Sequence, residues 1–86
     1  MFVAGGWSEF RAPTSEEVAM FHKTVKLTGV GYEPFAMATQ KVKGTNYKFL
    51  CNATAVTNPP YTFLAKVVIY VDLDNDPVLS SITELD

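Results

Sequence analysis

The sequence predicts an α+β domain in which one N-terminal α-helix packs across a four- to five-stranded antiparallel β-sheet. Apolar residues recur with a helical period between residues 14 and 28, and they alternate with polar residues from residue 32 onward. A single helix followed by consecutive strands must cover one face of the sheet, because no other element is available to bury that face. The 86 residues suit one domain spanning residues 1–86, and 48% of them are apolar, which is enough for one core.

The helix is predicted over residues 14–28, after an N-terminal segment and first strand over residues 1–13. Thr14 and Glu17 have the spacing of a capping box, in which two side chains satisfy free amides at the start of a helix. Gly29 is placed to end the helix in the left-handed conformation. The stripe that faces the sheet is expected to contain Val18, Phe21 and Val25.

An antiparallel meander is predicted over residues 32–86. Strands are expected over residues 32–43, 46–57, 62–71 and 78–85, separated by turns rich in glycine, asparagine, aspartate and proline. In the first three strands, alternate side chains form an apolar face. The expected members of this face are Phe35, Met37 and Thr39, then Tyr47, Phe49, Cys51, Ala53 and Ala55, and finally Phe63, Ala65, Val67 and Ile69.

Composition excludes several classes of function. Seven basic residues against nine acidic ones give a net charge of −2, so a nucleic-acid partner is not expected. No apolar run approaches the roughly 20 residues that span a bilayer, so no membrane partner is expected either. One cysteine and one histidine cannot build a structural zinc site, and phosphate-binding glycine motifs are absent, so neither a metal nor a cofactor is expected. Residues 1–4 lack the features of a signal peptide, which indicates a cytoplasmic location, with secretion or the periplasm as the alternative if a leader has been removed.

Enzymatic activity is not expected, and no catalytic residue is assigned. Cys51 and His22 are the only thiol and imidazole in the chain. Cys51 falls on the predicted core face, where a cysteine behaves as a small apolar side chain, whereas a nucleophilic thiolate needs a partly exposed, electropositive site. The acidic run from Asp72 to Asp76 lacks the glycine and the bidentate glutamate of a calcium-binding loop.

Three separate segments are expected to meet at one end of this fold. Alternate turns of an antiparallel meander lie at the same end of the sheet, so the turn at Gly44 and the turn at Leu73 share one end. The first strand brings Gly5-Gly6 to that end as well. We expect Gly44 to adopt a positive φ in its turn. Three loops that converge in this way form a wedge, a shape that fits a cleft.

These segments resemble the cystatins, protein inhibitors of papain-like cysteine proteases. Gln40-Lys41-Val42-Lys43-Gly44 matches the family signature Gln-x-Val-x-Gly, and Gly44-Thr45-Asn46-Tyr47 continues it in the pattern of the stefins, the intracellular branch. Gly5-Gly6-Trp7-Ser8-Glu9 is similar to the stefin N-terminus, and Leu73 and Pro77 are similar to the second stefin hairpin. The chain departs from the family in carrying lysine at both variable positions of the signature, where small or apolar residues are common.

The resemblance implies a reversible, tight-binding inhibitor of papain-like proteases that occludes the active-site cleft. It implies that residues 3–5 lie in the non-primed subsites, that Gly5 or Gly6 passes the catalytic cysteine, that Val42 fills the centre and that Leu73 covers the primed side. A non-inhibitory cystatin-fold binding module is the alternative, because two lysines beside Val42 would not suit every cleft. A monomer is expected, with a domain-swapped dimer as the alternative. The residues expected to contact a protease are Val3, Ala4, Gly5, Gly6, Gln40, Lys41, Val42, Lys43, Gly44, Leu73 and Asp74.

Overall fold

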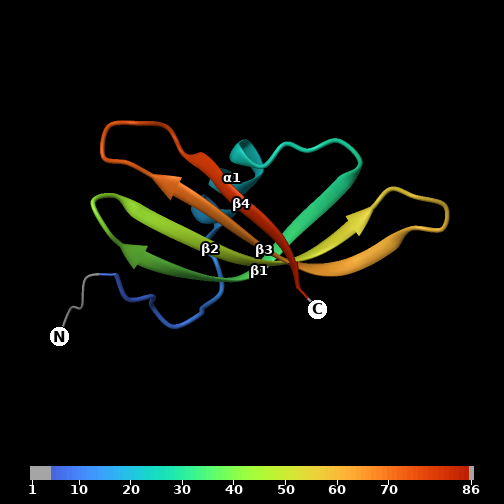
Figure 1. The fold of residues 1–86 in the computed structure, drawn as a ribbon, viewed down its shortest axis with the longest axis horizontal. Coiled ribbons are helices and arrows are strands. Elements are labelled where there is room, and N and C mark those ends of the chain that lie inside the picture. Colours follow the sequence, from blue (N-terminus) through green and yellow to red (C-terminus); the bar gives the residue numbers. More distant parts are fainter. Residues whose placement is uncertain (1–4, 86) are drawn as a thin grey trace.

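One helix packs on a four-stranded antiparallel sheet in the computed structural model, which describes residues 5–85 (Figure 1). The strands are ordered β1-β2-β3-β4, so each strand pairs with its neighbours in the sequence. This arrangement confirms the predicted α+β class. The elements are α1 (Ser15–Thr24), β1 (Val30–Lys41), β2 (Thr45–Ala55), β3 (Tyr61–Val71) and β4 (Val78–Leu85).

The core lies between α1 and the sheet. Phe21 of α1 is fully buried, and its ring meets the ring of Phe49 edge-on, with 5.0 Å between the centroids. Burial alternates along β2 and β3 as the sequence predicts, because every second side chain of a strand points to the same face. The buried cluster consists of Phe21, Val25, Met37, Phe49, Cys51, Val67 and Ile69.

The helix begins as predicted and ends earlier than predicted. Thr14 and Glu17 form the expected capping box. The last helical residue is Thr24 rather than residue 28, because Val25 turns to an extended conformation while its N–H still donates to the Phe21 carbonyl at 2.8 Å. Gly29 does have a positive φ of 89°, but it lies in the connection to β1 and does not cap the helix.

The strand boundaries also differ from the predicted ones by one or two residues, except in β4. β1 covers residues 30–41 instead of 32–43, β2 covers 45–55 instead of 46–57, and β3 begins one residue earlier than predicted. The predicted ranges of β1 and β2, the two strands of the first hairpin, thus lie one or two residues too far toward the C-terminus. The turn between β1 and β2 consequently contains residues 42–44, including Val42.

The prediction that Phe35 faces the core is wrong. Pro34 pairs with Cys51 and Ala36 pairs with Leu50, so Phe35 is an extra residue in a β-bulge, and it is 48% exposed. Proline has no N–H to donate, which prevents a regular ladder at this point and favours a bulge beside it. The alternation resumes one residue out of step, and Met37 then lies in the core opposite Phe49.

The N-terminal segment runs along the free edge of β1 without forming a regular strand. It makes two isolated bridges, one between Trp7 and Gln40 and one between Arg11 and Met37. Over residues 5–13, the predicted first strand is therefore replaced by these two bridges and the backbone hydrogen bonds of Gly5 and Ser8 to β1. Among the described residues, no helix is long and apolar enough to cross a membrane.

Candidate functional site

Three segments lie together at one end of the sheet, as the sequence predicts. The turn between β1 and β2 and the connection between β3 and β4 share this end, whereas the connection between β2 and β3 lies at the opposite end (Figure 1). Gly5 and Gly6 run beside the end of β1. Val3 and Ala4, also predicted to contact a protease, lie outside the described residues.

Gln40 connects the N-terminal segment to the first hairpin. Its side-chain Nε2 donates a hydrogen bond of 2.5 Å to the Gly5 carbonyl, and its Oε1 accepts one of 2.8 Å from the Asn46 side chain. The Gly5 N–H also donates to the Lys41 carbonyl at 3.4 Å. Both ends of the Gln40 amide are therefore occupied within the protein. In the unbound molecule, this residue orients the neighbouring segments.

Gly44 holds the first hairpin against the end of β3. It is buried, and a Cβ placed on it would collide with the Val71 carbonyl oxygen and lie 3.0 Å from the Asp72 Cα. The expected positive φ at Gly44 is wrong, because the described glycines with positive φ are Gly5 and Gly29. The glycine is required here by the close approach of two backbones.

The tips of both loops present apolar side chains to solvent. Val42 is 46% exposed in the first turn, and Leu73 is 79% exposed in the second loop. The second loop is organised by the Asp72 carboxylate, which accepts hydrogen bonds from the Leu73 N–H at 2.8 Å and from the Asn75 side chain at 3.3 Å. Exposed apolar side chains on loops with internal hydrogen bonds are suited to burial against a partner.

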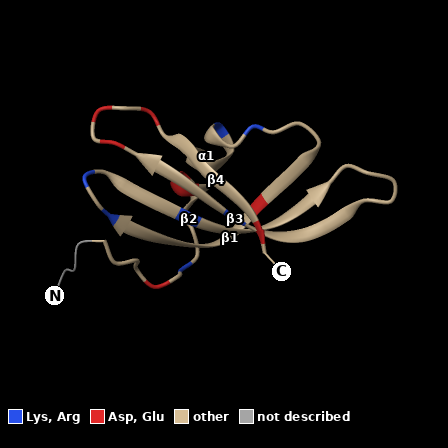
Figure 2. Ribbon diagram, in the orientation of Figure 1, with Lys and Arg blue, Asp and Glu red and all other residues tan. Residues whose placement is uncertain are grey.

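The two loops carry opposite charge (Figure 2). Lys41 and Lys43 are exposed on the first hairpin, and the Lys41 ammonium donates to the Thr45 hydroxyl at 3.2 Å. The second loop carries three aspartates, of which Asp74 and Asp76 are exposed. The surface formed by the three segments is thus basic on one side and acidic on the other. The three aspartates are Asp72, Asp74 and Asp76.

Cys51 lies in the core, on the face predicted for it. Its burial, with a smaller contribution from the Glu33 charge, raises the pKa of the thiol to about 12. The thiol therefore stays protonated near neutral pH and is a poor nucleophile. His22 lies on the helix surface, with its Nε2 3.8 Å from the Glu33 carboxylate. Among residues 5–85, no group of three or more His, Cys, Asp or Glu side chains could hold a metal ion.

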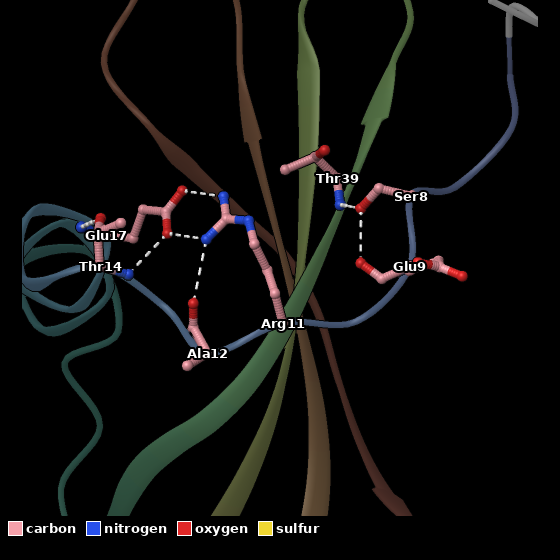
Figure 3. Close-up of polar contacts among 7 residues, drawn as sticks. All are labelled: Ser8, Glu9, Arg11, Ala12, Thr14, Glu17 and Thr39. Atoms are coloured by element: carbon pink, nitrogen blue, oxygen red, sulfur yellow. Dashed lines mark hydrogen bonds and ion pairs between the residues drawn. The ribbon is translucent and has the colours of Figure 1, made fainter.

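Sequence reasoning missed the side chains that fasten the N-terminal segment. The Ser8 hydroxyl accepts the Thr39 N–H of β1, and the Arg11 side chain binds Glu17 of α1 (Figure 3). The Lys48 ammonium from β2 lies 4.0 Å from the centroid of the Trp7 ring, a cation–π contact. A signal was present in the sequence, because an arginine shortly before a capping box can reach the glutamate that closes the box.

Comparisons with known proteins found no match for this chain, whether with protein-family models, curated proteins or solved structures. The function is therefore inferred from the geometry of the three segments and from the residues that they carry.

Proposed function

We propose that the protein is a reversible, non-covalent inhibitor of papain-like cysteine proteases, with a cystatin-like fold of the stefin type. One observation carries the proposal: the three segments that resemble stefin motifs lie at the same end of the sheet and are joined to one another. Gln40 binds Gly5 of the N-terminal segment, and Gly44 packs against the beginning of the second loop. One surface can therefore enter a single cleft.

In this mechanism the inhibitor performs no chemistry. Val42 and Leu73 leave water and become buried against the cleft, which supplies a hydrophobic contribution to binding. Gly5 and Gly6 have no side chains, so the backbone of the inhibitor can lie close to the catalytic cysteine of the protease. The loops are already held by internal hydrogen bonds, so binding avoids part of the roughly 1–2 kcal/mol per residue that ordering a backbone costs. We expect one copy of the inhibitor per protease and a total buried area of about 1,600 Å².

The test is titration of papain with the wild-type protein and two variants of equal exposure. Leu73 lies at the proposed binding end and Val56 follows β2 at the opposite end, and each is 79% exposed. Leu73→Ala should weaken inhibition about tenfold, chiefly through faster dissociation, and Val56→Ala should leave it unchanged. Both variants should keep the free energy of unfolding within about 0.5 kcal/mol of wild type, because these side chains are on the surface.

Absence of inhibition by micromolar wild-type protein, across endopeptidases and exopeptidases of the papain type, would contradict the proposal. The alternative is then a cystatin-fold module that binds another protein. The exposed Lys41 and Lys43 favour this second candidate, since two ammonium groups beside Val42 oppose entry into an electropositive cleft. Equal effects of Leu73→Ala and Val56→Ala on inhibition would likewise count against the proposed surface.

A further inference from the structure

Besides the contacts of Gly5 with Gln40 and Lys41, hydrogen bonds at Ser8 and Arg11 fasten the N-terminal segment to the edge of β1. Figure 3 shows the contact between Ser8 and Thr39. At Ser8, the backbone N–H donates to the Thr39 carbonyl at 2.7 Å, and the hydroxyl accepts the Thr39 N–H at 2.9 Å. At Arg11, the backbone exchanges two hydrogen bonds with Met37, of 2.9 and 2.8 Å. These contacts fix the path of the segment that leads to Gly5.

Arg11 also joins the segment to α1 through its side chain. Nη1 and Nη2 donate to the two carboxylate oxygens of Glu17 at 2.8 and 2.7 Å, and Nη1 donates to the Ala12 carbonyl at 3.1 Å. The Glu17 side chain is 18% exposed, so the pair is partly shielded from water. A planar guanidinium that binds both oxygens fixes the orientation of the two side chains, which a lysine ammonium does not.

Glu17 also closes the capping box of α1. Its Oε1 accepts the Thr14 N–H at 2.9 Å, and its own N–H donates to the Thr14 hydroxyl at 3.2 Å. The capping box therefore orients the Glu17 carboxylate that accepts the hydrogen bonds from Arg11. Because Phe21 anchors α1 in the core, the segment is connected through Arg11 to the most buried part of the molecule.

We propose that Arg11 is the positioning residue of the N-terminal binding segment, and that its pair with Glu17 determines where Gly5 and Gly6 meet the protease. This inference rests on the proposed function. Without the pair, the segment keeps its contacts with the exposed edge of β1 but loses the side-chain connection to α1, so it opens more often. A segment that must be ordered again during binding contributes less to the lifetime of the complex.

Arg11→Lys tests the proposal, because it keeps the positive charge and removes the two-pronged geometry. We expect the variant to dissociate from papain about 5- to 10-fold faster than wild type. Hydrogen exchange of the Ser8 and Arg11 amides should accelerate by a similar factor, while exchange at Val67 in the central strand β3 stays unchanged. Lys26→Ala, which removes an exposed positive charge from the connection between α1 and β1, serves as the control and should alter neither quantity.

The same substitution in a chain that lacks residues 1–6, and with them Gly5 and Gly6, separates positioning from general weakening. If Arg11 acts through the segment, Arg11→Lys should change the dissociation rate by a smaller factor in the shortened chain. An equal factor in both chains, or unchanged exchange at Ser8 and Arg11, would overturn the proposal. If the wild-type protein does not inhibit papain, the proposed function fails separately, and hydrogen exchange still decides whether Arg11 positions the segment.

Discussion

Gly44 occupies a position where no side chain fits. The backbone of the first hairpin passes so close to the end of β3 that a methyl group on Gly44 would meet the Val71 carbonyl oxygen and the Tyr70 hydroxyl. Backbone atoms cannot rotate away as a flexible side chain can. Any larger residue at this position must therefore push the first hairpin away from the second loop, and the two tips that carry Val42 and Leu73 would move apart.

Gly44→Ala should lower the free energy of unfolding by about 1–3 kcal/mol and weaken protease inhibition. The matched control is Gly31→Ala. Gly31 lies within β1 and Gly44 directly precedes β2, but a Cβ placed on Gly31 would have no atom within 4 Å, and Gly31 has no positive φ. The control should retain wild-type inhibition and be equally or slightly more stable. Urea unfolding and papain titration measure both quantities. Unchanged stability of Gly44→Ala would show that the two loops do not pack as described.

At the scale of elements, the start of α1 depends on the ionised form of Glu17. The hydrogen bonds from Arg11, assisted by those at Thr14, lower the pKa of Glu17 from its ordinary value of 4.5 to about 2. A carboxyl whose pKa is lower in the folded state stabilises the fold above its unfolded pKa, and this contribution disappears as the pH falls to the folded pKa. The window for the loss is therefore about pH 4.5 to about pH 2.

Glu17→Gln should be less stable than wild type near neutral pH, and the difference should shrink as the pH falls from about 4.5 to about 2. Glu16→Gln is the control, because it removes the same charge from an exposed side chain in the same helical turn. Its difference from wild type should be smaller and should vary less across this window. Urea denaturation at several pH values measures the free energy of unfolding of wild type, Glu17→Gln and Glu16→Gln. A constant difference between wild type and Glu17→Gln over the whole range would contradict the assigned Arg11–Glu17 pair.

The positions of the helix and the strands were predictable where a single local sequence pattern specifies them. Strict alternation located β2 and β3 and their core faces, and Thr14 and Glu17 located the start of the helix. The end of the helix was not predictable. Val25 is buried at the position where a continued helix would also place an apolar side chain, although its backbone is already extended. The exposed position of Phe35 depends on a bulge, which shifts the alternation by one residue without changing the composition of the strand.

The candidate site was predictable to a similar extent. Topology alone brings the turn at Gly44 and the turn at Leu73 to one end, since alternate turns of a meander share an end. The role of Gly44 was not predictable, because it depends on the distance between two backbones that are remote in sequence. The anchoring of the N-terminal segment by Arg11 was not predicted, because an arginine before the capping box can reach Glu17, but its position in the sequence does not show whether the chain folds so that it does.

At the scale of the whole molecule, the fold is an elongated body of 48 × 26 × 21 Å, with the candidate binding surface at one end of its sheet (Figure 1). The net charge of −2 is small, but the charges at this end are separated (Figure 2). Lys41 and Lys43 lie on the first hairpin, and Asp74 and Asp76 lie on the second loop. Exposed charges on the rim of an interface act mainly on the rate of association.

Lys41→Ala/Lys43→Ala should therefore slow association with a papain-like protease whose cleft rim is acidic, and speed it with one whose rim is basic. Asp74→Asn/Asp76→Asn should have the opposite effects on the same two proteases. The differences should be several-fold at about 20 mM salt and should nearly vanish at about 1 M salt, where the screening length is only about 3 Å. Stopped-flow measurement of association and dissociation at both salt concentrations checks this. Changes confined to dissociation and independent of salt would mean that the lysines make direct contacts in the cleft, and that the charge separation does not steer the two proteins together.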